Sequence, residues 1–536
     1  MPRQPVMLVS VLKKDGIEDP VGRFSQLGGH IIASRGTCEH LTKFGIHAMD
    51  VADYTGEEPW MQHLVVTIHP KIEGGLMVPD TEAGHAHLAE KGALFIDILF
   101  NTMYDMASAI ALPGATPESV RKDTDVGAIA MRHAAVKGNR ICAGSADRLN
   151  QVLATWEQGG VPDELRRALC SEMEMECAIY LLNLARFLSG GQVDGFIGRV
   201  THMLKYGENP FQIPADLLAD PGDNDPLGIQ QFEFLEGTAP SFINVRDYTR
   251  LIYLFRRMYS TFQVNGRPNF LFAAAIKHGN PCGAAFGTDP VDVMRRVIDG
   301  SPLSVMGGVV MTNFTVNPEV AEILTRYQWT AVRPRPMDGV LAPSFDDGAV
   351  DILRREKTQK CRMLANPALG GALPIIPRMH LSEVPGGWAR QPTNTRVLDL
   401  TWRFLTRSVQ CSPELEDDLL FATGVCSSSP SNTVTVVKNR TLYANGACQP
   451  DRVGCVEVAD HRMKKSKLDP TGSVLCSDSF LPDEDGARAI VALKPGLVFT
   501  TSGSINDKRV FPVFAEAGTP VYSVPDTEGR MFFGHG

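Results

Sequence analysis

The chain has 536 residues, of which 43% are hydrophobic and 21% are charged, and its formal net charge is −9. This length exceeds what one hydrophobic core usually supports, so we expect roughly two to four domains. The negative charge argues against a general nucleic-acid binder, because phosphate neutralisation requires a basic face, but it leaves room for a small basic pocket that binds a phosphorylated metabolite.

The apolar stretches and the cysteines indicate the compartment. The longest mainly apolar stretches, such as residues 92–99, are too short to cross a bilayer. The first residues lack the apolar segment and cleavage site of a signal peptide. The 11 cysteines are scattered without any Cys-x-x-Cys pair, which favours buried thiols over disulfides or a zinc site. We therefore expect a cytoplasmic protein with no metal site and no membrane partner.

The amino-terminal part alternates strand and helix patterns. Residues 6–11 and 30–34 are apolar and strand-like, whereas residues 21–27 and 39–44 have helical spacing. Strands separated by short helices predict a parallel sheet covered by helices, with ligands bound beyond the carboxyl ends of the strands.

Small polar residues follow the second of these strands and are candidates for a phosphate site. Ser34, Gly36 and Thr37 lie where the carboxyl end of a parallel strand would meet the next helix. The pattern Ser-x-Gly-Thr is short and by itself is weak evidence, and an ordinary turn is the simpler explanation. A further buried strand is predicted at residues 93–100, just before Tyr104.

Longer helical patterns cover residues 117–123, 127–136, 146–158 and 162–188, and the last one ends at a Ser-Gly-Gly sequence. We place a domain boundary near residue 200. Strand and helix patterns alternate again after this boundary, and no repeat of fixed period is visible.

The stretch of the second part that most suggests chemistry is Lys277-His278, which follows an apolar run, residues 270–276. We expect a buried strand that ends in a Gly-Asn-Pro-Cys-Gly turn at residues 279–283. A cation beside an imidazole suits a reaction that stabilises an oxyanion and moves a proton near neutral pH. An ordinary surface pair before a turn is the simpler alternative.

The remainder of the chain keeps the same alternation. A Pro/Gly-rich passage, residues 366–395, is predicted to be an irregular connection. Residues 413–423 have a helical pattern, and residues 433–437 and 441–446 are strand-like. The whole chain is therefore predicted to have an α/β fold.

A series of motifs, taken in chain order, resembles a known family. The motifs are Lys205–Gln212, Ala239–Asp247, Lys277-His278 with its Pro-Cys-Gly, Asp338–Pro343, Ser431–Thr433, Gly446–Arg452, Ser477–Pro482 and Arg530-x-Phe532. In residues and in order they resemble the bifunctional purine-biosynthesis family that carries AICAR transformylase and IMP cyclohydrolase activities. The similarity runs over nearly the whole chain.

The resemblance implies a fold and an assembly. An amino-terminal domain resembling methylglyoxal synthase would cover residues 1–198. A transformylase region would cover residues 199–536, as two cytidine-deaminase-like α/β units at approximately 199–365 and 395–536. The family is dimeric, so the resemblance also implies a homodimer with sites at the subunit interface.

The resemblance implies formyl transfer from the co-substrate 10-formyltetrahydrofolate to the 5-amino group of AICAR. In this chemistry His278 would be the proton shuttle, while Lys277 and Asn432 would stabilise the oxyanion and orient the formyl carbonyl. The implied ligand contacts are Lys205, Tyr206, Arg452 and Arg530 for the nucleotide phosphate and ribose, Asn244 and Asp338 for the ribose or carboxamide, and Phe480, Pro482, Asp485, Gly307 and Gly308 for the folate.

Two residues of this region depart from the family pattern. Lys205 stands where the family has Arg, which exchanges a bidentate fork for a point charge, and Phe211 replaces a His. Some implied roles also have a purely structural alternative. Caps of local turns would account for Asn432 and Asp338, and a core position would account for Phe480.

The cyclohydrolase motifs have lost cations. The family's Arg-Val-Lys-Thr-Leu-His-Pro corresponds to residues 64–70, where Leu64 and Val66 replace the two cations. The Ser-Asp-Lys-Thr-Gly loop is altered within residues 11–16, and Arg35 replaces a Gly. We therefore expect IMP cyclohydrolase activity to be weak or lost. The positions that match a cyclohydrolase-like site are Ser34, Gly36, Thr37, Thr67, Tyr104, Asp125 and Lys137.

Two alternatives stay open. A diverged paralogue would formylate a related heterocyclic nucleotide, for instance in nucleoside-antibiotic synthesis. A catalytically silent scaffold would bind a nucleotide without turnover. Release of tetrahydrofolate from 10-formyltetrahydrofolate in the presence of AICAR would separate the leading function from both alternatives.

Overall fold

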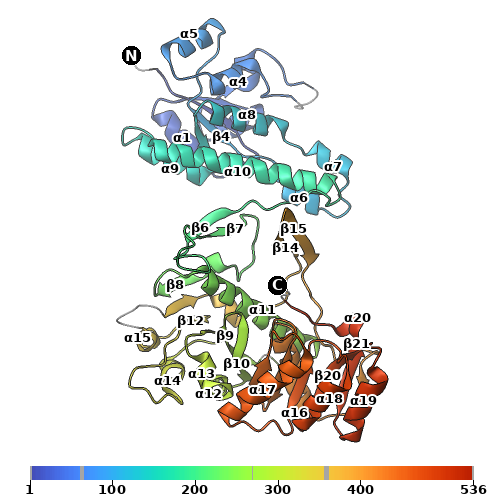
Figure 1. Cartoon of the computed structure of the whole chain (residues 1–536). Coiled ribbons are helices and arrows are strands. Elements are labelled where there is room, and N and C mark those ends of the chain that lie inside the picture. Colours follow the sequence, from blue (N-terminus) through green and yellow to red (C-terminus); the bar gives the residue numbers. More distant parts are fainter. Residues whose placement is uncertain (1–2, 61–64, 269, 355–360, 534–536) are drawn as a thin grey trace. The chain divides into compact units, whose positions relative to one another are not determined.

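The computed structural model describes residues 3–60, 65–268, 270–354 and 361–533 (Figure 1). The chain divides into two compact units, Met1–Ile197 and Gly198–Gly536. This division lies beside the boundary that we place near residue 200. Within the described ranges, no helix is long and apolar enough to cross a membrane.

Unit 1 is built on a parallel five-stranded sheet with the order β3-β2-β1-β4-β5. Its strands are β1 (Val6–Ser10), β2 (His30–Ala33), β3 (Met49–Asp50), β4 (Ile98–Asn101) and β5 (Ile141–Ala143). The central strands are apolar and buried because helices cover both faces. The strand order changes direction between β1 and β4, which places a crevice at their carboxyl ends.

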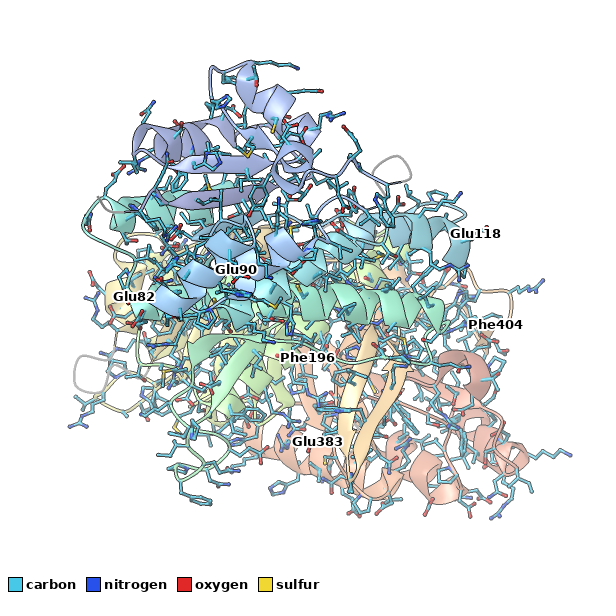
Figure 2. All side chains as sticks on the ribbon, turned by 90° about the horizontal axis from the view of Figure 1, so that it is seen from above. Glu82, Glu90, Glu118, Phe196, Glu383 and Phe404 are labelled. Atoms are coloured by element: carbon cyan, nitrogen blue, oxygen red, sulfur yellow. The ribbon has the colours of Figure 1, made fainter. Side chains whose placement is uncertain are left out.

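The helices of unit 1 begin mostly at side-chain caps, since Asp50, Thr81, Asp125 and Ser145 each accept a backbone N–H of the first turn. Glu82 and Glu90 mark the two ends of α5 in Figure 2. The helices are α1 (Glu18–Gln26), α2 (Arg35–Thr42), α3 (Val51–Thr55), α4 (Pro70–Met77), α5 (Glu82–Glu90), α6 (Met106–Ala111), α7 (Pro117–Lys122), α8 (Val126–Lys137), α9 (Ala146–Trp156) and α10 (Asp163–Leu188).

One predicted strand of unit 1 is shorter than expected. The strand expected at residues 93–100 begins only at Ile98, because its neighbour β1 begins at Val6 and pairs Met7 with Ile98. Asp97 still bonds to Val6 of β1 and Ile141 of β5 through its backbone, whereas residues 93–96 lie before the first residue of β1.

Unit 2 is built on a twelve-stranded sheet with the order β16-β21-β20-β19-β17-β18-β10-β9-β11-β12-β13-β8. The strands are β8 (Glu233–Glu236), β9 (Leu271–Lys277), β10 (Asn280–Gly287), β11 (Val309–Thr312), β12 (Gly339–Ala342), β13 (Arg362–Ala365), β16 (Thr406–Arg407), β17 (Val434–Lys438), β18 (Thr441–Gly446), β19 (Val474–Ser477), β20 (Leu497–Ser502) and β21 (Val521–Pro525). Two small hairpins lie outside it, β6 (Arg199–Met203) with β7 (Asp216–Ala219) and β14 (Met379–Val384) with β15 (Gly387–Pro392).

Helices connect these strands in unit 2. They are α11 (Phe242–Val264), α12 (Pro290–Gly300), α13 (Pro302–Val305), α14 (Pro318–Arg326), α15 (Ala349–Leu353), α16 (Pro413–Cys426), α17 (Arg452–Ser466), α18 (Glu484–Ala492), α19 (Asp507–Glu516) and α20 (Asp526–Gly529), with single turns η1 (Ile229–Gln231) and η2 (Pro367–Gly370).

Unit 2 contains the same arrangement twice. A helix, a β-hairpin and three helix–strand steps follow one another in α11-β9-β10-α12-β11-α14-β12-α15-β13 and again in α16-β17-β18-α17-β19-α18-β20-α19-β21. In each half the first hairpin strand pairs antiparallel with the third strand, and the last three strands pair in parallel. The two halves share an order of elements rather than a residue period, which is why the sequence shows no repeat.

The two halves join through β10 and β18, which pair antiparallel at Ala285 and Thr441. Equivalent strands of the two halves therefore run in opposite directions. As a result, the turn of the β9–β10 hairpin and the turn of the β17–β18 hairpin lie at opposite edges of the sheet.

The turn predicted at residues 279–283 is wrong. The turn has only two residues, His278 and Gly279, after which the chain returns along β9 as strand β10. Both residues have positive φ, 51° and 74°, as in the type I′ turn that matches the twist of a hairpin. Pro281 and Gly283 did not stop the strand, because the register shifts between them and a bulge tolerates a residue without an N–H.

The irregular connection predicted at residues 366–395 is also wrong in part. Strands β14 and β15 form a regular antiparallel hairpin within it, on which Glu383 is labelled in Figure 2. Pro385 and Gly386 only make its turn, and Gly386 has a φ of 83°. Most side chains of the hairpin are exposed, so no alternation of buried and polar residues marked it in the sequence.

An aromatic cluster holds the two halves of unit 2 together. Phe286 on β10 is fully buried and contacts Phe262 and Phe270 from its own half, with ring centroids 5.1 Å away in each case. It also contacts Phe421 on α16 of the other half at 4.8 Å. Core aromatic residues of this kind contribute strongly to stability because their removal leaves a cavity.

We predict that Phe286→Ala lowers the free energy of unfolding of unit 2 by about 3–5 kcal/mol. The measurement is urea dependence of hydrogen exchange in β9 and β10. Phe211→Ala is the control, since the Phe211 side chain is 80% exposed, and it should change stability by less than about 0.5 kcal/mol. Equal effects of the two substitutions would contradict the role of the cluster.

Candidate active site

Most of the residues that we assign to the transformylase site lie at one edge of the twelve-stranded sheet. The pairing directions show that β9, β18, β19, β20 and β21 end at this edge, where β10, β11, β12 and β17 begin. The candidate residues that follow or precede these strand ends are Lys277, His278, Gly307, Gly308, Asp338, Asn432, Arg452, Phe480, Pro482, Asp485 and Arg530.

A first cluster surrounds Lys277 at the end of β9. The Lys277 ammonium donates to the carbonyl oxygen of Met306 at 2.9 Å, just before Gly307 and Gly308. A Cβ on Gly308 would lie 2.9 Å from the carbonyl oxygen of Ile276, so only glycine fits beside β9 here. The backbone N–H of Asp338 donates to Gly308 at 2.9 Å, so these four candidate residues are brought together.

His278 occupies the first turn position and is exposed. Asp247, from the first turns of α11, lies below the turn and accepts the backbone N–H of Gly279 at 2.8 Å. Burial raises the pKa of Asp247, while the N–H groups of Gly279 and His278 hold it down. Asp247 is the last residue of the motif Ala239–Asp247. An aspartate at this position could not be distinguished from an ordinary helix residue by the sequence alone.

Asn244, Lys205 and Tyr206 lie around the start of α11. The Asn244 side-chain oxygen accepts the backbone N–H and the hydroxyl of Ser241, each at 2.9 Å, and closes a capping box. The Asn244 oxygen is thus used within the chain, and the ligand contact expected of Asn244 stays a prediction that would fall to its amide N–H groups. Lys205 is exposed, with its ammonium 5.9 Å from the ring of Tyr206.

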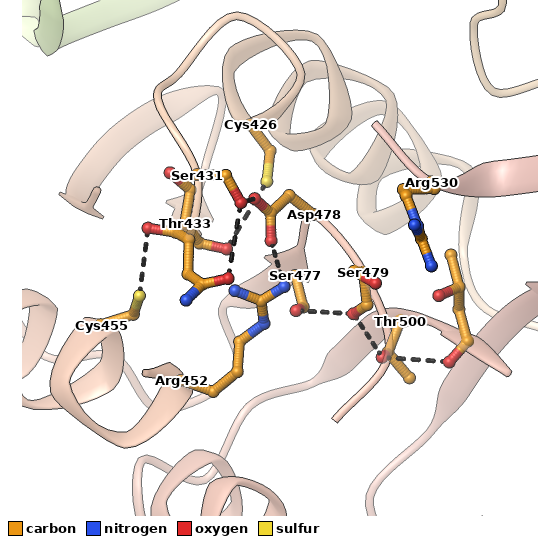
Figure 3. A network of polar contacts seen from close by, with 12 residues as sticks. Cys426, Ser431, Thr433, Arg452, Cys455, Ser477, Asp478, Ser479, Thr500 and Arg530 are labelled. Carbon is orange, nitrogen blue, oxygen red and sulfur yellow. Dashed lines mark hydrogen bonds and ion pairs between the residues drawn. The ribbon is translucent and has the colours of Figure 1, made fainter. Parts of the chain in front are cut away.

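A second cluster contains Arg452 and Asp478 (Figure 3). Arg452, the first residue of α17, forms an ion pair of 2.7 Å with Asp478 after β19. Both residues are buried, and Ser431 donates to the second Asp478 oxygen at 2.6 Å. Burial raises the pKa of Asp478, whereas Arg452 lowers it. Asp478 was not identified from the sequence, where nothing local marks a buried ion pair.

Arg452 retains hydrogen-bonding capacity. Its Nε and Nη1 have no hydrogen-bond partner within the described part of the chain, although they are buried. Buried guanidinium N–H groups that the protein leaves unpaired suit a carboxylate or phosphate. These N–H groups and the amino-terminal end of α17 make this position a candidate anion site, which stays a prediction.

Asn432 lies beside this ion pair, just before β17. Its amide nitrogen donates to the carbonyl oxygens of Gln449 and Pro450, both at 3.0 Å. Since an amide has two N–H donors, the side-chain oxygen is the atom that remains for a ligand. In this arrangement Asn432 offers an acceptor, and its expected part in stabilising the oxyanion and orienting the formyl carbonyl stays a prediction.

The candidate folate residues extend along the same edge. Phe480 is half-buried two residues after Asp478, and Pro482 and Asp485 are exposed at the start of α18. Arg530 is exposed and forms an ion pair with Asp526, which also accepts the Ser479 hydroxyl at 2.9 Å. Arg530 is thus connected to the segment that carries Phe480.

The two clusters do not meet within one chain. Strands β9 and β17 are separated by β10 and β18, which corresponds to about 14 Å at the usual strand spacing. His278 and Asn432 therefore lie too far apart to contact the same small group from a single copy.

Unit 1 brings part of the cyclohydrolase-like set together after β2. The Ser34 hydroxyl lies 3.2 Å from that of Thr37, at the start of α2. The Lys14 ammonium lies 3.9 Å from the position of a Cβ on Gly36. Lys14 was not among the expected site residues and supplies a cation beside these hydroxyls. Arg35 instead forms ion pairs of 3.1 Å with Asp50 and 3.6 Å with Glu58.

A second part of this set lies at the start of α8. Asp125 caps α8 by accepting the N–H of Ala128 at 2.8 Å, and the N–H of Tyr104 contacts its other oxygen at 3.4 Å. A Cβ on Gly127 would lie 2.8 Å from the Thr67 hydroxyl. Leu64, one of the two residues that replace the cations of the family motif, lies outside the described residues.

Lys137 does not belong to this set, which corrects its assignment. It is the last residue of α8, which Asp125 caps at the other end, and a helix of this length spans about 18 Å. Lys137 lines a cavity of ≈ 480 Å³ at the opposite edge of the sheet, together with Arg140 and Arg166. The residue type matched, but helix geometry separates the two ends.

Comparisons with known proteins identify a family for this chain. A family model described as AICARFT/IMPCHase bienzyme matches residues 141–462. The bifunctional purine biosynthesis protein PurH of Chlorobium phaeobacteroides (strain DSM 266 / SMG 266 / 2430) is 29% identical over 517 residues, covering 94% of both chains. PurH of Cutibacterium acnes is 29% identical over 549 residues and covers 99% of both. The crystal structure of ForH is 28% identical, covers 35% of this chain and 100% of its own, and has a TM-score of 0.32.

We predict that Arg452→Met weakens binding of inorganic phosphate and lowers the free energy of unfolding by about 3–5 kcal/mol, because the Asp478 carboxylate stays buried without its cation. Thermal unfolding with and without phosphate measures both effects. The double variant Arg452→Met/Asp478→Asn should recover most of the stability without recovering phosphate binding. A phosphate-induced shift in melting temperature that survives in both variants would exclude Arg452 as the anion ligand.

Proposed function

Because the chain belongs to the AICARFT/IMPCHase bienzyme family, we propose that it transfers the formyl group of 10-formyltetrahydrofolate to the 5-amino group of AICAR in purine biosynthesis. The observation that carries this proposal is the Lys277-His278 pair, held at a strand end beside Gly307, Gly308 and Asp338. This geometry suits proton transfer at a carbonyl group that is being attacked.

The proposed reaction is demanding because the carboxamide withdraws electrons from the attacking amine. A bond forms between the amine nitrogen and the formyl carbon, and the carbon–nitrogen bond to the folate then breaks. The amine loses a proton and the departing folate nitrogen gains one. The exposed imidazole of His278 is suited to carry that proton, because an imidazole has one nitrogen that accepts a proton and another that donates one.

Lys277 and Asn432 take different parts in the proposal. One N–H of the Lys277 ammonium is anchored on Met306, which leaves its other N–H groups for the oxyanion. Asn432 offers its side-chain oxygen, so we assign it to the attacking amine, whose N–H it would orient. Arg452 would bind the nucleotide phosphate through the N–H groups that the chain leaves unpaired.

The proposal includes a homodimer. Since the His278 and Asn432 clusters are about 14 Å apart along one sheet, one copy would supply the first cluster and its partner the second. The finer fold assignment belongs to the same proposal: unit 1 would be methylglyoxal-synthase-like, and the two halves of unit 2 cytidine-deaminase-like. No disulfide joins the cysteines of the described residues, which favours a reducing compartment such as the cytoplasm.

We propose that the IMP cyclohydrolase activity is weak rather than absent. Val66 replaces a cation of the motif, whereas Lys14 still lies beside Gly36. The Phe211 side chain is 80% exposed. A diverged paralogue that formylates a related heterocyclic nucleotide stays the alternative, and AICAR is the substrate that the proposal names.

We predict that His278→Asn lowers the rate of formyl transfer by about 10²–10⁴-fold, the contribution expected of a general acid–base group. Asn suits this test because Asn439 occupies the equivalent position of the second hairpin turn with the same φ of 51°. The turn should therefore persist without its imidazole. Tetrahydrofolate release measures the rate, and an unchanged rate would end the assignment of His278.

We also predict that the full chain closes the ring of formyl-AICAR at least about 10²-fold more slowly than the Cutibacterium acnes relative, in line with the loss of a positioned donor. Formation of IMP followed by absorbance measures both rates under one set of conditions. Val66→Lys should raise the rate of this chain. Equal rates in the two unmodified proteins would contradict the loss of activity.

A further inference from the structure

The two hairpin turns of unit 2 have the same geometry, although they lie at opposite edges of the sheet. In the first turn, His278 and Gly279 have φ of 51° and 74°. In the second turn, Asn439 and Arg440 have φ of 51° and 62°. Three of these four residues carry a side chain in a left-handed conformation, which costs free energy and requires support from the surroundings.

A buried aspartate supports each turn from below. Asp247 on α11 accepts the N–H of Gly279 at 2.8 Å, and Asp418 on α16 accepts the N–H of Arg440 at 2.7 Å. The two carboxylates are 6% and 5% exposed. In both cases the N–H of the preceding turn residue also acts on the carboxylate, and burial raises the pKa, to about 6 for Asp418.

A lysine fixes the start of each turn. Lys277 donates to the carbonyl oxygen of Met306 at 2.9 Å, and Lys438 donates to that of Asp469 at 3.0 Å. Each carbonyl belongs to the segment that leads into the next strand of the same half. Each turn is therefore held at two points, one by the lysine and one by the aspartate.

The two turns differ in what they present. His278 is exposed at the edge that carries the Gly307-Gly308 and Arg452 clusters, whereas Asn439 is exposed at the other edge. The contribution of Asp247 to the stability of the first half is thus matched by that of Asp418 in the second half. Only the first aspartate lies below an imidazole.

We propose that Asp247 is a positioning residue for formyl transfer, which fixes the direction of the His278 imidazole by holding the backbone N–H groups of the turn. This inference rests on the proposed function, in which His278 carries the proton. Without the carboxylate, the left-handed residues relax toward ordinary conformations and the imidazole moves by more than an ångström. A displacement of that size is enough to reduce a rate by about 10²-fold.

The experiment compares Asp247→Ala with Asp418→Ala in the full-length chain. The two carboxylates have nearly the same burial, and each accepts the backbone N–H of the second residue of its turn. Both substitutions should therefore lower the melting temperature by similar amounts. Only Asp247→Ala should lower kcat for formyl transfer, by about 10²-fold, with KM for AICAR changed by less than about threefold. Asp247→Asn keeps an oxygen that accepts the Gly279 N–H and should recover most of the lost kcat.

Hydrogen exchange tests the turn without relying on activity. Asp247→Ala should accelerate exchange of the Gly279 amide and leave the Arg440 amide unchanged, and Asp418→Ala should do the reverse. If the unmodified chain transfers no formyl group, the proposed function fails while this measurement still reports on the turn.

Three results would overturn the inference. One is an unchanged kcat in Asp247→Ala together with faster exchange at Gly279. Another is an equal loss of kcat in Asp418→Ala, which would indicate general destabilisation. The third is an Asp247→Asn variant as slow as Asp247→Ala although its Gly279 amide is protected as in the unmodified chain.

Discussion

The antiparallel pairing of β10 with β18 determines the arrangement of the site. It joins two similar halves so that equivalent strands run in opposite directions. The hairpin turn of one half consequently lies at the same edge as the carboxyl ends of β18 and β19 in the other half. With a parallel pairing, Lys277 and Arg452 would lie at opposite edges. Lys277 of the first half and Arg452 of the second half therefore share one edge of the sheet only because of this one strand pair.

The sequence predicted that Lys277 and His278 lie at a strand end, because the apolar run directly before them indicates a buried strand that ends there. It did not predict strand β10, since Pro281 and Gly283 usually stop a strand and a bulge that tolerates them leaves no local signal. Asp247 and Asp478 were missed for a related reason. Their importance comes from burial and from partners distant in the chain, which a residue type at one position cannot reveal.

Unit 1 illustrates the opposite error: a residue matched the family pattern in type, but the fold places it away from the other residues of the set. Lys137 agrees with the family pattern, yet α8 carries it away from Asp125 to the other edge of the sheet. Lys14, which lies in a loop that departs from the family pattern at neighbouring positions, places its ammonium beside Gly36. Matching by position therefore overestimated one cation and underestimated another, and the balance of charge at this crevice emerges only from the fold.

The unpaired N–H groups of Arg452 also bear on how long the protein survives in a cell. A buried donor without a partner is costly, so an anion that satisfies it stabilises the folded chain over every unfolded form. At a hundred times the dissociation constant this linkage amounts to about 2.7 kcal/mol, enough to suppress transient opening and attack by proteases roughly a hundredfold. An anion bound at Arg452 would thereby lengthen the lifetime of the protein.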